Sequence, residues 1–290
     1  MKHGHDSGMK NEKLLGKSNS GTEDQRWCPD WLVNWIQTYL TALWNLRNLL
    51  VRRTAAEVAA DIIDENLPNA CSYTFVDPCA GAGGPIPAIE KALNAKYGFP
   101  VKCILADLRP CVKEWEAIQK KQESISFIED PVDATKCAKV TPGRECRVFN
   151  IAFHHFDDES AQKILSSAMQ SGDAFIVFEF LQRDLTTFLF WCLTTVSPLP
   201  LLHTPPQLQR FPWCIFAPFV SGLALIPLAI DGFVSMLRTR TPEEIKDLTG
   251  KPGCVSDEWT FKHGRSRIVG PWYLHWQLGY KPLSKEAKHD

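Results

Sequence analysis

The sequence predicts an α/β protein built on a doubly wound, mostly parallel sheet. Short apolar runs alternate with segments of helical periodicity between residues 75 and 180. Acidic residues close three successive runs, and a glycine-rich turn follows the first of them. Strands and helices that alternate in this way form right-handed crossovers, with helices on both faces of one sheet. N-terminal helices and an apolar helical insertion are expected outside this core.

The composition disfavours several functional classes. The 32 Lys and Arg residues nearly balance the 33 Asp and Glu residues, so no global field attracts nucleic acid. The ten cysteines form no C-x-x-C pair and no cluster with zinc spacing, and we therefore expect no metal. Residues 1–24 are polar and lack the apolar core of a secretory signal. The cysteines are therefore best explained as reduced thiols in a cytosol-facing protein.

The pattern divides the 290 residues into five segments. They are a disordered tail (1–24), an N-terminal helical segment (25–70), a cofactor-binding α/β core (71–184), an apolar insertion (185–237), and a C-terminal helix and β-hairpin that complete the core (238–290).

Two helices are predicted in the N-terminal segment. The first, Pro29–Arg53, has a broad apolar stripe that includes Trp31 and Trp35. Such a stripe packs on a core, caps a substrate or lies on a membrane surface. The second, Thr54–Asn66, opens with Thr54 and with Glu57 three residues later, which together form a capping box.

The core elements follow in alternation. Expected strands are 75–77, Val101–Ala106, Ser126–Ile128, Arg147–Phe153 and Ala174–Phe180, and expected helices are Ile86–Lys96, Val112–Gln122 and Glu159–Gln170. The C-terminal part adds a helix, Thr241–Leu248, with proline at its first helical position. Two strands, Trp259–Ile268 and Trp272–Tyr280, are joined by a short Gly-Pro turn.

The turn after the first strand is the most informative motif. Asp77 is followed by Pro78-Cys79-Ala80-Gly81-Ala82-Gly83-Gly84. Glycine lets a backbone approach a bound cofactor without a clashing Cβ. The dinucleotide fingerprint G-x-G-x-x-G would need glycine where this chain has Ile86, and no Gly-Lys-Ser/Thr follows as in a P-loop. A carboxylate ahead of the turn suits a cationic or hydroxyl-bearing ligand.

Asp77 and the glycine turn, with Asp107 and Asp133 after the next two strands, resemble the motifs of class I S-adenosylmethionine-dependent methyltransferases. The terminal hairpin resembles that family's sixth and seventh strands, the last of which runs antiparallel. The resemblance implies a seven-stranded sheet, S-adenosyl-L-methionine as cofactor, and ribose and adenine contacts at Asp107 and Asp133. Cofactor-binding roles are implied for Asp77, Cys79, Gly81, Gly83, Asp107, Leu108, Asp133 and Ala134. Each acid also has a simpler interpretation as a turn-capping residue.

His154 and His155 stand at the end of the fourth predicted strand and resemble the His-His segment of small-molecule methyltransferases. Either imidazole can act as a base if the acceptor is a hydroxyl or an acidic carbon. Both can equally be structural residues that shape the pocket. Glu179, late in the fifth strand, is a weaker candidate.

The apolar insertion is the least expected feature. Leu185–Leu202 and Phe211–Ile230 contain no charged residue, and His203–Arg210 separates them. About 20 apolar residues span a bilayer as a helix, but prolines interrupt both runs. A membrane hairpin, a soluble lid over a greasy substrate, and ordinary core or an oligomer interface all remain open.

The sequence therefore predicts a methyltransferase that acts on a lipophilic small molecule or lipid, with His154 and His155 as catalytic candidates. We expect a membrane-associated, cytosol-facing enzyme, with a soluble cytoplasmic protein as the alternative. No nucleic-acid partner is expected, and the oligomeric state is left open. A non-catalytic methyltransferase-like binding or assembly protein is the alternative function.

Overall fold

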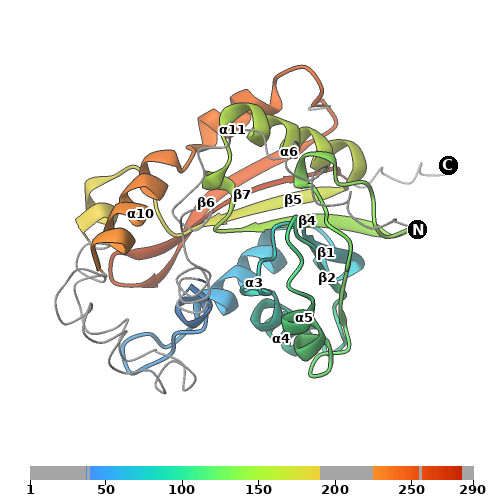
Figure 1. Ribbon diagram of the computed structural model, residues 1–290, viewed down its shortest axis with the longest axis horizontal. Coiled ribbons are helices and arrows are strands. Elements are labelled where there is room, and N and C mark those ends of the chain that lie inside the picture. Colours follow the sequence, from blue (N-terminus) through green and yellow to red (C-terminus); the bar gives the residue numbers. More distant parts are fainter. Residues whose placement is uncertain (1–36, 38–39, 190–224, 255–256, 283–290) are drawn as a thin grey trace, which may run out of the picture.

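The computed structural model describes residues 37, 40–189, 225–254 and 257–282. Its centre is a seven-stranded sheet with the order β3-β2-β1-β4-β5-β7-β6 (Figure 1). The five strands β1 to β5 run parallel, and β7 is antiparallel to both of its neighbours. The strands are β1 (Tyr73–Asp77), β2 (Cys103–Leu105), β3 (Ile125–Phe127), β4 (Arg144–Asn150), β5 (Ala174–Glu179), β6 (Thr260–Val269) and β7 (Trp272–Tyr280). The predicted doubly wound, mostly parallel sheet is confirmed.

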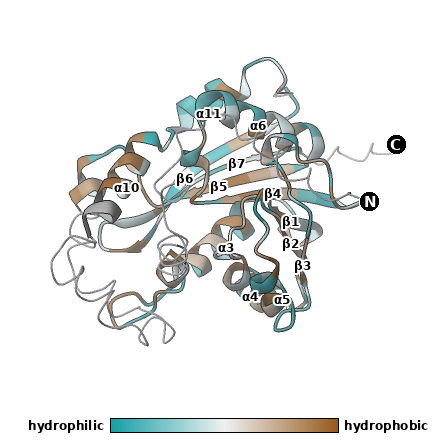
Figure 2. Ribbon diagram, viewed as in Figure 1, coloured by the Kyte–Doolittle hydropathy of each residue, from teal (hydrophilic) through white to brown (hydrophobic). Residues whose placement is uncertain are grey.

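Helices cover both faces of the sheet and form two apolar cores (Figure 1). One face carries α3 (Ala55–Asn66), α4 (Ile86–Tyr97) and α5 (Val112–Gln119). The other carries α6 (Asp158–Ser171) and α11 (Pro242–Thr249). All six residues of β5 are buried, and this strand has the hydrophobic colour in Figure 2. A strand covered on both sides reads as a continuous apolar run, which explains why the alternating pattern is absent from Ala174–Glu179.

The order of the strands places a switch point between β1 and β4. The chain moves from β1 outward to β3, then returns to the other side of β1. In open sheets of this kind, ligands bind outside the carboxyl ends of the strands at the point where the order reverses. Any residue at the ends of β1 and β4 is therefore well placed to contact a ligand.

Local signals in the sequence fix several helix starts. The capping box predicted at Thr54 is present, with the Thr54 hydroxyl and the Glu57 carboxylate each accepting a backbone N–H. Thr241 and Glu244 form a second capping box at the start of α11. The predicted boundaries elsewhere in the core differ from the structure by up to three residues, because strand ends depend on the neighbouring strands.

The first predicted helix was too long. In the described part, helical backbone ends at Trp44 and does not continue to Arg53. The Asn48 side chain accepts the backbone N–H groups of Leu50 and Val51, at 2.9 and 2.8 Å. Asparagine competes for the backbone in this way and favours turns over helices. Trp44 itself is buried against Phe178 and Phe180.

The fourth strand also differs from its prediction. β4 begins at Arg144 and ends at Asn150, three residues earlier than expected at both ends. Ile151 then adopts a φ of 51°, which is rare for a β-branched residue. A 3₁₀ turn, η4 (Phe153–His155), follows directly. The predicted histidine pair therefore lies on a turn beyond the sheet.

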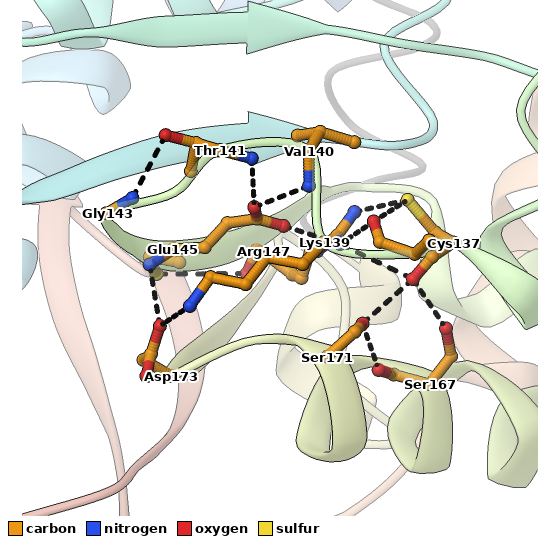
Figure 3. A network of polar contacts seen from close by, with 12 residues as sticks. Cys137, Lys139, Val140, Thr141, Gly143, Glu145, Arg147, Ser167, Ser171 and Asp173 are labelled. Atoms are coloured by element: carbon orange, nitrogen blue, oxygen red, sulfur yellow. Dashed lines mark hydrogen bonds and ion pairs between the residues drawn. The ribbon is translucent and has the colours of Figure 1, made fainter.

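A buried polar network fixes the start of β4 (Figure 3). Arg147 and Glu145 are nearly inaccessible and form an ion pair with a 2.5 Å contact. The Arg147 guanidinium donates to the Cys137 thiol and, at 2.6 Å, to the Ala138 carbonyl oxygen. Glu145 accepts the backbone N–H groups of Val140 and Thr141. Buried charges are tolerated when they are paired and hydrogen-bonded in this way, so the network attaches the preceding loop to the strand.

Most of the apolar insertion lies outside the described residues, which include only 185–189 and the last helix of the segment. That helix, α10 (Leu225–Arg238), has 14 residues with Pro227 in its first turn. Its outer face exposes Ile230, Phe233 and Leu237. No helix that the structure describes combines the length and hydropathy required to traverse a bilayer.

Candidate functional site

The glycine-rich turn after β1 folds back onto the end of β2. The Gly81 N–H donates to the Asp107 carboxylate at 2.8 Å, and the Ala80 N–H donates to the Ala106 carbonyl at 3.0 Å. Gly81 has a φ of 51° and Gly83 a φ of 111°, a region that side chains disfavour. A Cβ on Gly83 would lie 2.4 Å from the Ile118 side chain. The backbone conformation of the turn therefore favours glycine at both positions.

Asp77 closes β1 and is only 1% exposed. Its carboxylate accepts the Cys79 N–H at 3.0 Å and the Asn150 side-chain amide at 2.8 Å. Burial raises the pKa of this carboxyl to about 7, and the neighbouring Asp107 charge acts in the same direction, while the two hydrogen bonds oppose it. The bond from Asn150 joins β1 to β4 across the switch point. A carboxylate held here at such a desolvation cost suits a cationic ligand.

Asp107 follows β2 and lies between the glycine turn and the third strand's loop. Its second carboxylate oxygen accepts the Arg109 N–H at 2.8 Å, and its carbonyl accepts the Val132 N–H at 2.9 Å. Leu108 is exposed beside it. An ionised carboxylate is an acceptor with about four lone-pair sites for N–H and O–H donors.

Asp133 is placed near Asp107 by the Val132 contact, but its carboxylate acts locally. It accepts the Thr135 N–H at 2.9 Å and the Thr135 hydroxyl at 2.6 Å. Although partial burial alone would raise it, the bonds from Thr135 and the neighbouring Lys136 hold the pKa of Asp133 below its ordinary value. Ala134, the first residue of this 3₁₀ turn, is buried. The contacts of the Asp133 side chain are therefore those of a turn-capping residue.

His154 is held by Glu179 at the end of β5. The Glu179 carboxylate lies 2.8 Å from Nδ1 of His154 and also accepts the His154 backbone N–H at 3.2 Å. Both side chains are buried. The His155 ring packs beside His154, with 4.3 Å between ring centroids. This geometry orients one imidazole of the pair and leaves its Nε2 as the atom available for proton transfer.

Arg240, between α10 and α11, clamps the histidine turn. Its guanidinium donates to the carbonyl oxygens of Phe153 and Phe156, at 3.2 and 2.7 Å, and pairs with Asp158. It also lies over the Phe153 ring. A residue just after the insertion therefore fixes a turn that is more than 80 residues earlier in the sequence.

Several residues of this region were not predicted. Asn150 was noted only as the start of the histidine segment, and its role depends on a contact 73 residues away. Trp115 donates to the Gly81 carbonyl at 2.9 Å, yet in the sequence it is simply an apolar residue of a helix. The Gln37 side chain lies 3.6 Å from the position of a Gly81 Cβ. No local pattern marks these residues, because their contacts are all long-range.

The seven-stranded, mostly parallel sheet with helices on both faces is a methyltransferase-like α/β fold. No protein-family model matches the sequence, and no curated protein does either. Among solved structures, an O-methyltransferase family protein from Burkholderia thailandensis is 12% identical, with a TM-score of 0.45 over 80% of this chain and 57% of that chain.

Two further solved structures show a similar level of likeness. The O-methyltransferase NcsB1 from neocarzinostatin biosynthesis, in complex with S-adenosyl-L-homocysteine and 1,4-dihydroxy-2-naphthoic acid, is 10% identical, with a TM-score of 0.43 over 79% of this chain and 57% of that chain. The 1,6-didemethyltoxoflavin-N1-methyltransferase of Burkholderia thailandensis is 13% identical, with a TM-score of 0.43 over 88% of this chain and 91% of that chain. The chain spans just over half the length of the first methyltransferases it matches.

Proposed function

We propose that the protein is an S-adenosylmethionine-dependent methyltransferase with a small-molecule acceptor. The observation that carries the proposal is the polar connection along the carboxyl edge. Asn150 bonds Asp77 across the switch point, and Asp107 bonds the glycine turn that follows Asp77. Two acids, a glycine turn and Asn150, from the ends of β1, β2 and β4, thereby face one region of the sheet.

The residues present fit this cofactor. Asp77 provides a buried carboxylate, and Oδ1 of Asn150 beside it is buried without a hydrogen-bond partner among the described atoms. Two acceptors in one buried place suit the ammonium group of the cofactor's methionine part. The Asp107 carboxylate, at the end of β2, would accept the ribose hydroxyls. Leu108, Asp133 and Ala134 would lie on the adenine side, with Cys79, Gly81 and Gly83 forming the turn.

The bound cofactor would supply a methyl group on a sulfonium. The protein's own task is then to align the acceptor, exclude water and remove a proton if the acceptor is a hydroxyl. His154 is the better-oriented candidate for the base, since Glu179 fixes its ring through Nδ1. His155 would contribute to the same pocket from the adjacent position.

The finer part of the proposal is a lipophilic acceptor and association with a membrane. Its support is the apolar surface that the described part of the insertion exposes. Leu185, Leu189, Ile230, Phe233 and Leu237 are all exposed, and Phe188 packs on Phe233 to join the two pieces. Apolar patches of this kind on soluble domains mark partner, membrane or ligand surfaces.

A non-catalytic methyltransferase-like protein is the second candidate. The observation that favours it is Asp133, whose carboxylate is engaged by its own turn and by Lys136. Transfer of labelled methyl groups from the cofactor into a lipid extract would support the enzyme. Cofactor binding without any transfer would support the binding protein.

Calorimetric titration with S-adenosylhomocysteine tests the cofactor site. We expect the wild type to bind and Asp107→Ala to bind at least tenfold more weakly, because a hydrogen bond to a charged group contributes about 1.5–3 kcal/mol. Asp130→Ala is the matched control, since Asp130 is an exposed acid beyond the neighbouring strand β3. Equal affinity of the wild type and Asp107→Ala would remove Asp107 from the site, and absence of binding to the wild type would refute the proposal.

A further inference from the structure

A row of polar side chains crosses the last three strands of the sheet. Glu179 of β5 lies directly opposite His275 of β7, and His275 lies directly opposite Arg265 of β6. Residues in direct register share one face of a sheet. Adjacent strands are about 4.8 Å apart, so the row extends about 10 Å from Glu179 to Arg265. Its inner end is the carboxylate that holds His154.

The outer end of the row carries two exposed arginines. Arg265 and Arg267 are two positions apart on one strand and therefore point to the same face. Their guanidinium groups lie over the Tyr273 ring, with 4.9 and 5.7 Å to its centroid. Neither arginine forms an ion pair with any carboxylate that the structure describes, although Arg267 donates to the Gly270 carbonyl. Two neighbouring cations without a counterion repel each other, and an anion between them would relieve that cost.

His275, in the middle of the row, lies within range of the Asp184, Glu179 and Arg265 charges and beside the Tyr273 ring. It is 9% exposed and makes no hydrogen bond with the described residues. With Glu179, Arg240 and Gln277 it lines a cavity of about 20 Å³, which holds roughly one water-sized group. Buried polar side chains are nearly always hydrogen-bonded. An imidazole left open to such a cavity therefore indicates a place for one ligand oxygen.

We propose that Arg265, Arg267 and His275 form an anion-binding subsite that recognises a carboxylate or phosphate group on the acceptor. Planar guanidinium groups bind such groups through paired hydrogen bonds, and the Tyr273 ring that both arginines contact restricts their orientation. The acceptor would carry its acid group about 10 Å from the β5 end that holds His154. That the bound molecule is a methyl acceptor rests on the proposed function. Binding of an anion at the subsite itself requires no cofactor.

The acid group has two sources, a soluble acid or the headgroup of an anionic lipid. The probes are therefore 3-hydroxy-2-naphthoate and 2-naphthol, which differ by one carboxylate, and vesicles of phosphatidylglycerol and of phosphatidylcholine. We expect the wild type to prefer the anionic member of at least one pair by roughly tenfold, from charge-assisted hydrogen bonds. Preference for the naphthoate alone identifies a soluble acid, and preference for the anionic vesicles alone identifies a headgroup.

The double variant Arg265→Ala/Arg267→Ala should reduce that preference to within about twofold, and Arg265→Lys should retain part of it because lysine keeps the charge without the planar fork. Arg52→Ala is the matched control, because Arg52 is exposed and has no ion pair with any residue in the described ranges. Unchanged thermal unfolding of each variant excludes a folding defect. A wild type without preference in either pair, or a double variant that keeps the preference, would overturn the subsite.

The titration with S-adenosylhomocysteine separates this proposal from the proposed function. The arginine variants should bind S-adenosylhomocysteine as the wild type does, because none of the predicted cofactor residues lies on β6. If anion preference persists while S-adenosylhomocysteine fails to bind, the subsite stands and the methyltransferase proposal falls. If S-adenosylhomocysteine binds but the wild type shows no anion preference, only the subsite is refuted.

Discussion

Asp77 lies in an environment that costs the fold stability, and the proposed cofactor would use its chemistry. The carboxyl is buried, and its pKa is raised to about 7 chiefly by that burial. In the unfolded chain it would titrate near its ordinary value. Between those two pH values the native state retains a proton that the unfolded state has lost. The contribution of Asp77 to the unfolding free energy is therefore fully present below about pH 4 and is lost as the pH rises through about 7.

Asp77→Asn should remove this dependence. The asparagine oxygen can accept the Cys79 N–H, and its amide can donate to the unpaired Oδ1 of Asn150. We expect the variant to exceed the wild type in unfolding free energy by roughly 2–4 kcal/mol near pH 8, with little difference near pH 4.

Urea denaturation of both proteins across this range measures the difference. Parallel pH profiles for wild type and variant would show that Asp77 is ionised throughout. S-adenosylhomocysteine affinity of the variant, measured alongside, should fall, because a neutral amide loses the attraction for an ammonium group. A more stable protein with weaker ligand binding would identify a functional residue that the fold alone does not require.

Helix starts are the elements that the sequence predicted best. The box at Thr54 needs only four consecutive residues, so its signal is complete within a short window. Predicting the end of β4 required information from outside the local sequence. Asn150-Ile151-Ala152-Phe153 reads as a continuation of an apolar strand, but Ile151 turns the chain with a positive φ that only the surrounding contacts can enforce. The Ile151 N–H donates to the Phe178 carbonyl on the next strand, which no local window contains.

The site residues likewise divide into those with a local sequence signature and those that depend on distant contacts. Asp77, Gly81 and Asp107 were predicted because strand ends and glycine turns have local signatures, and the structure joins Gly81 to Asp107 by a hydrogen bond. Their roles toward a ligand remain predictions. Asn150 and His275 were missed, since each depends on a partner strand.

The capping box of α11 provides a test at this scale. Thr241→Ala removes the hydroxyl that accepts the Glu244 N–H and should destabilise the protein by about 1 kcal/mol. For a protein of this size the midpoint of thermal unfolding should fall by about 2–4 °C. Thr241→Ser keeps the hydroxyl and should restore most of the loss. If alanine and serine behave alike, the box contributes nothing to stability.

The whole molecule presents exposed apolar side chains beside the histidine turn, since α10 contacts η4. If this surface associates with a membrane, the full chain should sediment with membranes in high salt. Phe233→Glu/Leu237→Glu should shift it to the supernatant, because a buried charge in the interface is costly. Lys121→Glu, at an exposed site on α5's C-terminal side, is the control for added acid.

The wild type in the supernatant would support the soluble alternative. Retention after a carbonate wash would separate an embedded segment from a surface contact. Either result bears on the acceptor, because a membrane-bound enzyme meets lipophilic molecules at high local concentration.

The position of β7 has a consequence for how the protein is made. This strand, near the end of the sequence, inserts between β5 and β6. While the ribosome is still translating the chain, β5 has β4 on one side and an open row of backbone groups on the other. Such a row, on a wholly apolar strand, invites pairing with other chains. Nascent copies halted before Trp272 should thus depend on chaperones far more than completed ones.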